Sequence, residues 1–185
     1  MLNKYSLKNI LLLIIAFLVI NVNAQSKVWT PEISIKIKQI SDLNFSNNNK
    51  IAMVVREALT DGEKSEYLSQ IWLSHTDFSE PIQFTYHEKS STHPRFSPDG
   101  KFLAFISDRV EKPQIWVIRT SGGEAWQFTF EKQGVGSFKW SPNGSKIAFL
   151  MKDPKTEKEE KDEKEKRDVI LVDKNFKYSH LYLKS

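Results

Sequence analysis

The feature that most constrains this chain is an internal repeat, in which separate sequence elements recur with the same spacing. A turn flanked by an aromatic residue and an apolar run reads FSPDGKFLAF at 96–105 and WSPNGSKIAF at 140–149. A second element, QIWL at 70–73, returns as QIWV at 114–117. Both elements recur after 44 residues, so the chain contains copies of one structural unit of about that length.

Two further matches extend the repeat. The sequence QFT at 83–85 returns at 127–129, again 44 residues later. The segment FSNNNKIAMV at 45–54 is a degraded copy of the turn and its apolar run, 51 residues before the intact copy. A period of 40–50 residues is typical of propellers and other repeat folds, so the repeat itself predicts the fold class.

The repeated turn has the residue preferences of a type I β-turn. Proline presets φ at the second position, and serine or aspartate hydrogen-bonds back to the backbone. Glycine at the fourth position lets the chain leave the turn without steric strain. In the degraded copy Asn49 replaces the glycine, and we expect the turn to persist there because asparagine tolerates a positive φ. The residues of the two intact turns are Ser97, Pro98, Asp99, Gly100, Ser141, Pro142, Asn143 and Gly144.

The segments between the turns have the character of short strands. The almost wholly apolar run 102–106 is too short for a helix and rich in aromatic residues, which favours a strand buried on both faces. Segments 115–118 and 125–129 have the same character and flank a hairpin turn at 121–124. Four short antiparallel strands per unit make one propeller blade. A sandwich or barrel would also have short strands and turns, but neither requires the sequence to repeat.

The sequence therefore predicts an all-β chain with about two and a half blades of four antiparallel strands. Blade one covers 40–85 and blade two 92–130. Blade three covers 136–185 and contains a charged insertion at 152–168. A closed propeller needs about 4–8 blades, so we expect a fragment of a closed propeller whose partners include the missing blades. One repeat position, predicted to lie in each blade core, holds Trp72, Trp116 and Tyr182.

The first 24 residues have the layout of a secretory signal peptide. Lys4 and Lys8 precede an apolar run of 11 residues at 10–20, and small side chains then lead to a cleavage point between Ala24 and Gln25. The alternative is a membrane anchor, which needs about 20 apolar residues. We expect an exported protein, periplasmic or extracellular, with no membrane segment after cleavage and a lead-in segment at 25–39.

The chain contains one long, highly charged insertion. Segment 152–168 holds seven basic and eight acidic residues, which predicts either a solvated helix beginning near Pro154 or a disordered loop. A contact arm for a partner is the functional alternative.

The overall charge does not predict a nucleic-acid partner. The chain has a formal charge of +4, but no basic cluster stands free of acidic neighbours, so no nucleic-acid footprint is present.

The sequence contains no recognisable catalytic or cofactor motif. No glycine is followed by serine two positions later, so the G-x-S-x-G elbow of serine hydrolases is absent. The chain has no cysteine, and no phosphate loop or metal motif predicts a cofactor. We expect structural roles for all four histidines, and a local ion pair or turn contact for Asp108 and Arg109. The histidines are His75, His87, His93 and His180.

Several motifs together resemble a known family. The turn at 97–101, the QIWV strand and the GGE-x-x-QFT hairpin at 122–129 are similar to the propeller repeat shared by TolB-like proteins and the prolyl oligopeptidase family. Three further segments resemble the start of exported dipeptidyl-peptidase-like and acylaminoacyl-peptidase-like members. They are WTPE at 29–32, Arg56-Glu57 and EKSEY at 63–67. The degraded first turn and the charged insertion depart from the family pattern.

The resemblance implies a propeller that sits over a C-terminal α/β-hydrolase domain with a Ser/Asp/His triad. This chain would then be the N-terminal propeller portion of a secreted serine peptidase. It would act as substrate filter and lid for short peptides, and no triad residue would lie within residues 1–185. The alternative is a non-catalytic TolB-like periplasmic propeller that binds proteins. A third possibility is a truncated gene product with no stable fold.

Overall fold

The computed structural model describes residues 29–61, 64–165 and 178–185. The predicted signal peptide, with its cleavage point at Ala24 and Gln25, lies outside these residues. Within the described ranges, no helix has the length and apolar character needed to cross a membrane. The chain divides into two compact units, 1–35 and 36–185. The short helix α2 (Pro31–Lys36) spans the boundary between them, and all the strands belong to the second unit.

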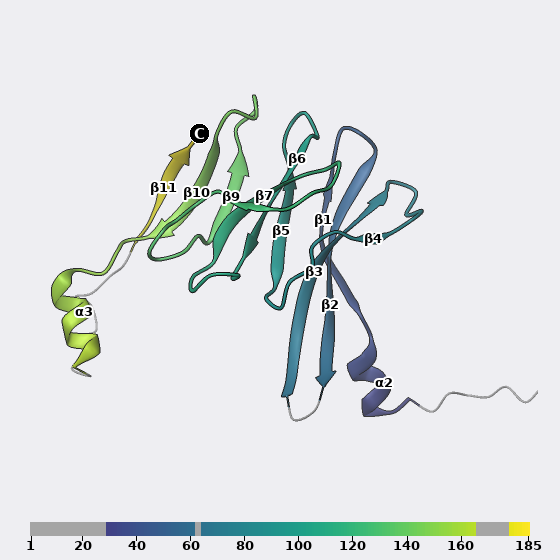
Figure 1. Ribbon diagram of the computed structural model, residues 1–185, viewed down its shortest axis with the longest axis horizontal. Coiled ribbons are helices and arrows are strands. Elements are labelled where there is room, and N and C mark those ends of the chain that lie inside the picture. The colour runs from purple at the N-terminus through teal and green to yellow at the C-terminus, as the bar shows by residue number, and fades with distance from the viewer. Residues whose placement is uncertain (1–28, 62–63, 166–177) are drawn as a thin grey trace, which may run out of the picture. The chain divides into compact units, whose positions relative to one another are not determined.

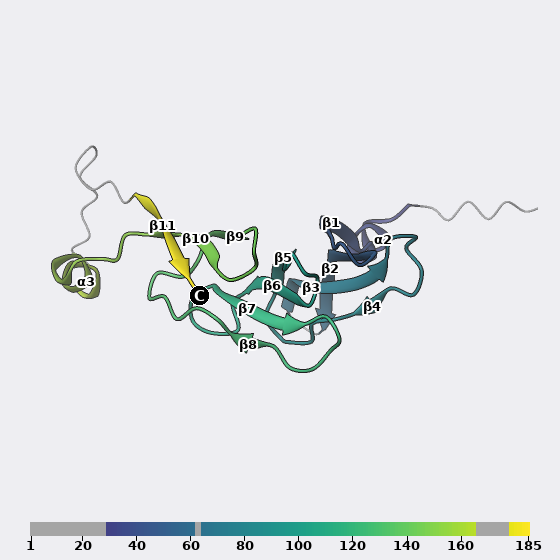
Figure 2. The same cartoon turned by 90° about the horizontal axis from the view of Figure 1, so that it is seen from above.

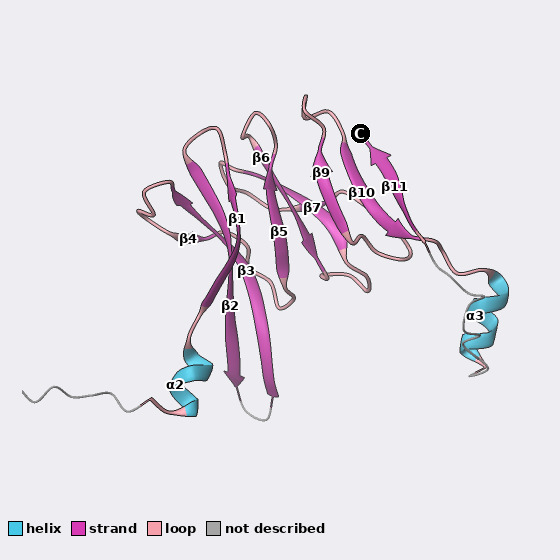
Figure 3. Ribbon diagram, turned by 180° about the vertical axis from the view of Figure 1, so that it is seen from behind, coloured by secondary structure: helices cyan, strands magenta, loops and turns pink. Residues whose placement is uncertain are grey.

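The strands of the second unit form three separate antiparallel sheets (Figures 1 and 3). The first sheet has the order β1-β2-β3-β4 and the second has the order β5-β6-β7-β8. The third has the order β11-β10-β9, so each sheet follows the chain as a simple meander. The strands are β1 (Gln39–Phe45), β2 (Lys50–Asp61), β3 (Lys64–His75), β4 (Ile82–Gln83), β5 (Ser91–Phe96), β6 (Phe102–Ser107), β7 (Gln114–Arg119), β8 (Trp126–Gln127), β9 (Ser137–Trp140), β10 (Ile147–Lys152) and β11 (Ser179–Lys184).

These sheets have the arrangement of consecutive propeller blades. Each lies beside the next in chain order, as the two views from above and from behind show (Figures 2 and 3). None of the three sheets closes on itself. The prediction of an all-β partial propeller is therefore confirmed. We refer to the three sheets as blades one, two and three.

The fourth strand of each complete blade is shorter than the sequence suggests. The apolar character of 125–129 predicts a strand of several residues, whereas β8 contains only Trp126 and Gln127. The reason is a change in the hydrogen-bond ladder, because the amides of Phe128 and Thr129 both donate to the carbonyl of Ile115. Two consecutive donors on one acceptor end the regular pairing. Blade one shows the same arrangement after β4.

The described part of the charged insertion contains one helix, α3 (Glu157–Lys164). It begins three residues after Pro154, because Thr156 caps it. The Thr156 Oγ1 atom accepts a hydrogen bond from the Glu159 amide, and the Glu159 carboxylate accepts one from the Thr156 amide. This reciprocal pair is a capping box, which fixes a helix start. Residues 166–168 of the predicted insertion lie outside the described ranges.

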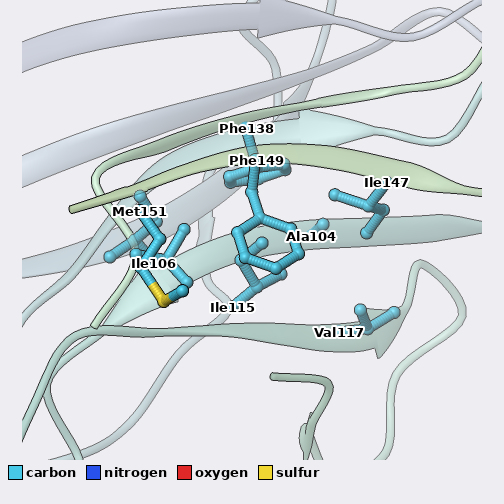
Figure 4. Close-up of a cluster of buried hydrophobic side chains, with 9 residues drawn as sticks. Ala104, Ile106, Ile115, Val117, Phe138, Ile147, Phe149 and Met151 are labelled. Carbon is cyan, nitrogen blue, oxygen red and sulfur yellow. The ribbon is translucent and has the colours of Figure 1, made fainter. Parts of the chain in front are cut away.

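The hydrophobic core lies between the blades. Figure 4 shows the cluster between blades two and three, in which Ala104, Ile106, Ile115 and Val117 face the side chains of blade three. An equivalent cluster joins blade one to blade two. Each blade therefore buries its apolar side chains against a neighbouring blade. The blade-three members are Phe138, Ile147, Phe149 and Met151.

Candidate functional site

The two intact turns have the same hydrogen-bond arrangement. In blade two the Ser97 hydroxyl donates to Asp99 Oδ1 at 2.6 Å, and the Lys101 amide donates to the same oxygen at 3.1 Å. These bonds, with that from Ser97 the larger cause, hold the pKa of Asp99 below its ordinary value. In blade three Asn143 Oδ1 accepts the corresponding bond from the Ser141 hydroxyl at 2.8 Å. Pro98 and Pro142 occupy the second turn position, while Gly100 and Gly144 both have a φ of +70°.

The degraded first turn makes contacts to the next blade that its sequence does not predict. Asn49 has a φ of +54°, as expected for the residue that replaces glycine. The neighbouring side-chain amides of Asn47 and Asn48 donate to the Pro98 and Asp99 carbonyls at 3.0 and 3.4 Å. These asparagines therefore hydrogen-bond one turn to the next. A Cβ atom on Gly100 would lie 2.6 Å from the Asn48 amide nitrogen and displace that side chain, and the φ of +70° also favours glycine there.

The repeated glutamine and threonine form one buried polar network in each complete blade. In blade two the Thr129 hydroxyl donates to Gln114 Oε1 and accepts from the Ile115 amide, both at 2.8 Å. The Gln114 amide also donates to a loop carbonyl, that of Glu131. In blade one the equivalent threonine makes the same two bonds. The network explains why the QIW and QFT elements repeat together, because a buried polar group needs its partner.

The predicted core aromatics lie at the margins of the clusters. Trp72, Trp116 and Tyr182 sit at one register position, each opposite the residue that follows the repeated alanine in the second strand of its blade. All three are half-buried and pack against the fully buried side chains. Their outer faces are therefore open to solvent or to other groups.

The first strands of blades one and two, β1 and β5, are joined by an ion pair that sequence analysis did not identify. Arg95 Nη1 lies 2.7 Å from Asp42 Oδ1, and both side chains are about two-thirds buried. Asp42 and His93 occupy equivalent repeat positions, and both have a positive φ. The pairing register shifts at both sites, so each strand carries a bulge there. Strained residues and bulges of this kind are over-represented at functional sites.

The face of blade three that points away from blade two is open. Leu181 and Leu183 on β11 are 67% and 66% exposed, and Leu150 on β10 is also exposed. The register places Leu181 and Leu183 where blade two has Ile115 and Val117. Those two side chains are 0% and 2% exposed, because blade three covers them.

A groove of about 350 Å³ lies between blades one and two. Arg109 lines this groove. Its guanidinium carbon lies 5.4 Å from the centre of the Phe105 ring and 5.2 Å from that of the Trp116 ring. The side chain of Arg109 therefore lies over these two rings and makes no ion pair with Asp108. Desolvation by this partial burial lowers the pKa of Arg109. The other lining residues are Phe84, Thr85, Tyr86, Ile118, Gly123, Glu124 and Ala125.

The histidines do not gather into a site. Among the described residues, no group of three histidine and acidic side chains could hold a metal ion. In blade three, His180 Nε2 on β11 lies 3.1 Å from Oδ1 of Asp153, which directly follows β10. His87 Nδ1 accepts from the Lys89 amide, and His93 Nδ1 lies 3.2 Å from the Thr92 hydroxyl. These are local contacts of single side chains.

Comparison with known sequences identifies the repeat. Residues 45–177 match the family described as the TolB beta propeller domain. Uncharacterized peptidase YuxL of Bacillus subtilis (strain 168) is 37% identical over 83 residues, which cover 45% of this chain and 12% of that protein. The chain therefore spans only a small part of the length of this relative.

Solved structures show the same fold. An acylaminoacyl peptidase in complex with Z-Gly-Gly-Phe-chloromethyl ketone superposes with a TM-score of 0.61 and 21% identity, covering 78% of this chain and 21% of that one. A protein described as TolB from Agrobacterium tumefaciens superposes with a TM-score of 0.53 and 20% identity, covering 80% of this chain and 45% of that one. The resemblance to the propeller repeat of TolB-like proteins and oligopeptidases is thus confirmed.

Proposed function

Because this chain belongs to the TolB β-propeller domain family, we propose that it is the N-terminal propeller portion of an exported serine peptidase that hydrolyses short peptides. The propeller acts as a substrate filter and lid. A C-terminal α/β-hydrolase domain outside residues 1–185 carries the catalytic triad. The 37% identity to the peptidase YuxL supports this assignment over that of a propeller without an enzyme.

The single observation that carries the proposal is the open face of blade three. Leu181 and Leu183 are exposed at positions whose counterparts in blade two are buried by the next blade. Exposing two leucines instead of burying them forgoes about 1.5–3 kcal/mol for each side chain. We therefore assign this face to contact with a further blade of the same protein, which continues the ring toward closure.

The filter role rests on how tightly adjacent blades are joined. Hydrogen bonds between turns, the Asp42–Arg95 ion pair and two apolar clusters connect blade one to two and blade two to three. A ring of blades held this way admits only what fits its channel, and larger polypeptides are excluded. The predicted signal peptide supports export of the whole protein.

The peptidase assignment is tested on the complete gene product with a fluorophosphonate probe, which labels an activated serine covalently. We expect labelling and hydrolysis of an acetylated dipeptide nitroanilide. The filter is tested with the variant Asp42→Ala, which removes the ion pair between β1 and β5, and with Glu88→Ala as the matched exposed control. Cleavage of a peptide of about 30 residues, relative to the dipeptide, should rise in Asp42→Ala only.

Two results would overturn the proposal. Absence of labelling and of hydrolysis in a folded, complete protein would contradict the peptidase assignment. An unchanged ratio of long to short peptide cleavage in Asp42→Ala would contradict the filter role and leave the enzyme assignment standing.

The second candidate function is a non-catalytic propeller that binds other proteins in the periplasm. The family match favours it as much as the first candidate, because TolB gives the family its name. A complete gene product that remains unlabelled but retains a defined protein partner after purification would support it.

A further inference from the structure

We propose that the groove between blades one and two binds the carboxylate of a small ligand through Arg109. The inference concerns residues within the described structure and is independent of whether the complete protein is a peptidase. It rests on the unsatisfied donors of Arg109, on an internal comparison with blade one, and on the residues that line the groove.

The first argument is that the hydrogen-bond donors of Arg109 lack partners. Its Nε atom is buried and unbonded, and so is the Nε1 atom of the adjacent Trp116. No other side-chain nitrogen or oxygen in the described ranges is buried without a partner. The contacts of Arg109 to Phe105 and Trp116 engage the charge but satisfy none of its N–H groups. A partly buried guanidinium without an anion is costly, which indicates a site for one.

The second argument comes from the equivalent place in blade one. Lys38 there lies over the Trp72 ring at 5.6 Å, as Arg109 lies over Trp116. Lys38 also binds the carboxylate of Glu57 at 2.7 Å. Glu57 occupies the repeat position of Arg109, four residues after the strand residue that faces the tryptophan. Blade one thus pairs its cation with a carboxylate of its own, whereas Arg109 has no such partner among the described residues.

The third argument is the chemistry of the groove. A planar guanidinium fork matches the two oxygens of a carboxylate and binds them in bidentate fashion. Phe84 and Tyr86 offer apolar surface beside it for a group attached to that carboxylate. Glu124 lines the same groove and would repel a second negative charge. The site therefore favours a monoanion with an apolar group, such as an acylated amino acid, over a phosphate dianion.

The probe for the test is hippurate, which is benzoylglycine, titrated calorimetrically into the complete gene product. Its amide, hippuramide, has the same shape without the charge. We expect saturable binding of hippurate and at least about tenfold weaker binding of hippuramide. Inorganic phosphate should not compete at equal concentration.

Variants locate the binding. Arg109→Gln should weaken hippurate binding at least about tenfold, and Arg109→Lys should weaken it less because the charge remains. Arg119→Gln is the matched control, since Arg119 is exposed and also lies over a tryptophan ring, that of Trp126, at 5.9 Å. It should bind hippurate as the unchanged protein does.

Several outcomes would overturn the inference. Equal binding of hippurate and hippuramide would show that no carboxylate is recognised, a result that does not depend on any variant folding. Unchanged affinity in Arg109→Gln would place the bound ligand elsewhere, including a catalytic site in another domain. Tighter binding of phosphate than of hippurate would contradict the carboxylate assignment.

Discussion

The same face of the same repeat is buried in blade two and exposed in blade three. Ile115 and Val117 are almost completely inaccessible, whereas Leu181 and Leu183, at the equivalent register positions, are about two-thirds exposed. Side-chain chemistry does not distinguish them, because all four are large and aliphatic. Blade three covers Ile115 and Val117, whereas no described residue covers Leu181 and Leu183. The comparison underlies our proposal that the exposed face is an interface.

The largest expected effect comes from truncating this face in the complete gene product. Ile115→Ala should destabilise the propeller by about 2–5 kcal/mol, as removal of a buried aliphatic side chain does. Leu181→Ala should cost a comparable amount if a further blade covers it. Urea unfolding of both variants measures the two costs. A value below about 0.5 kcal/mol for Leu181→Ala would show an exposed surface position and contradict the covered face.

A smaller effect should follow from breaking the polar network inside a blade that is covered on both sides. Thr129→Val keeps the shape but removes the hydroxyl that joins the Ile115 amide to Gln114. The buried groups left unsatisfied should cost about 1–3 kcal/mol in urea unfolding. Thr129→Ser, which retains the hydroxyl, is the control and should cost less. Equal costs for the two variants would mean that the methyl group and not the hydroxyl stabilises the blade.

The ion pair between the first strands of blades one and two should contribute less to stability. Asp42→Asn leaves the geometry nearly unchanged and removes one charge from the pair with Arg95. Partial exposure screens the interaction, so we expect a loss of about 0–1 kcal/mol in urea unfolding. Salt should reduce the difference between the variant and the unchanged protein. A loss of several kcal/mol would show that the pair is part of a more deeply buried network than the structure indicates.

The smallest expected effect is a difference in acid sensitivity between the turns of blades two and three. Asp99 has a pKa below its ordinary value of 3.8 in the folded chain. Its ionised form therefore stabilises the fold above pH 3.8, and this contribution is lost as the pH falls through the lowered pKa. Asn143 makes the same bonds but does not titrate. Asp99→Asn should thus reduce the loss of melting temperature between pH 6 and pH 3, and an identical loss would contradict the assignment.

The repeat predicts the blades because the residues that define each blade lie within one copy of the repeat. Turn residues, apolar strand segments and the paired glutamine and threonine all lie within one unit of 44 residues, so their pattern is visible in the sequence. Contacts between blades are different in kind. The Asn48–Asp99 and Asp42–Arg95 contacts join residues 51 and 53 positions apart. They depend on how one sheet sits beside the next, which residue spacing alone does not predict.

The candidate groove was missed for the same reason. A sequence containing Asp108 and Arg109 side by side suggests a local ion pair, but the arginine reaches two rings of its own blade instead. The available signal was the contrast between copies, since Glu57 occupies the position of Arg109. The sequence alone does not show that the cation over the tryptophan has a carboxylate partner in blade one and none in blade two.

The central claim, that the open face of blade three is an interface within a larger propeller, is tested most directly by thiol labelling. The chain has no cysteine, so Leu183→Cys introduces a single thiol into residues 1–185. Leu73→Cys, at the equivalent position of blade one, is the buried control, and Ser145→Cys is the exposed control. In the complete gene product, maleimide should label Leu183→Cys about a hundredfold or more slowly than in urea, as it does Leu73→Cys. Labelling as fast as that of Ser145→Cys would show that nothing covers this face, and would contradict the account.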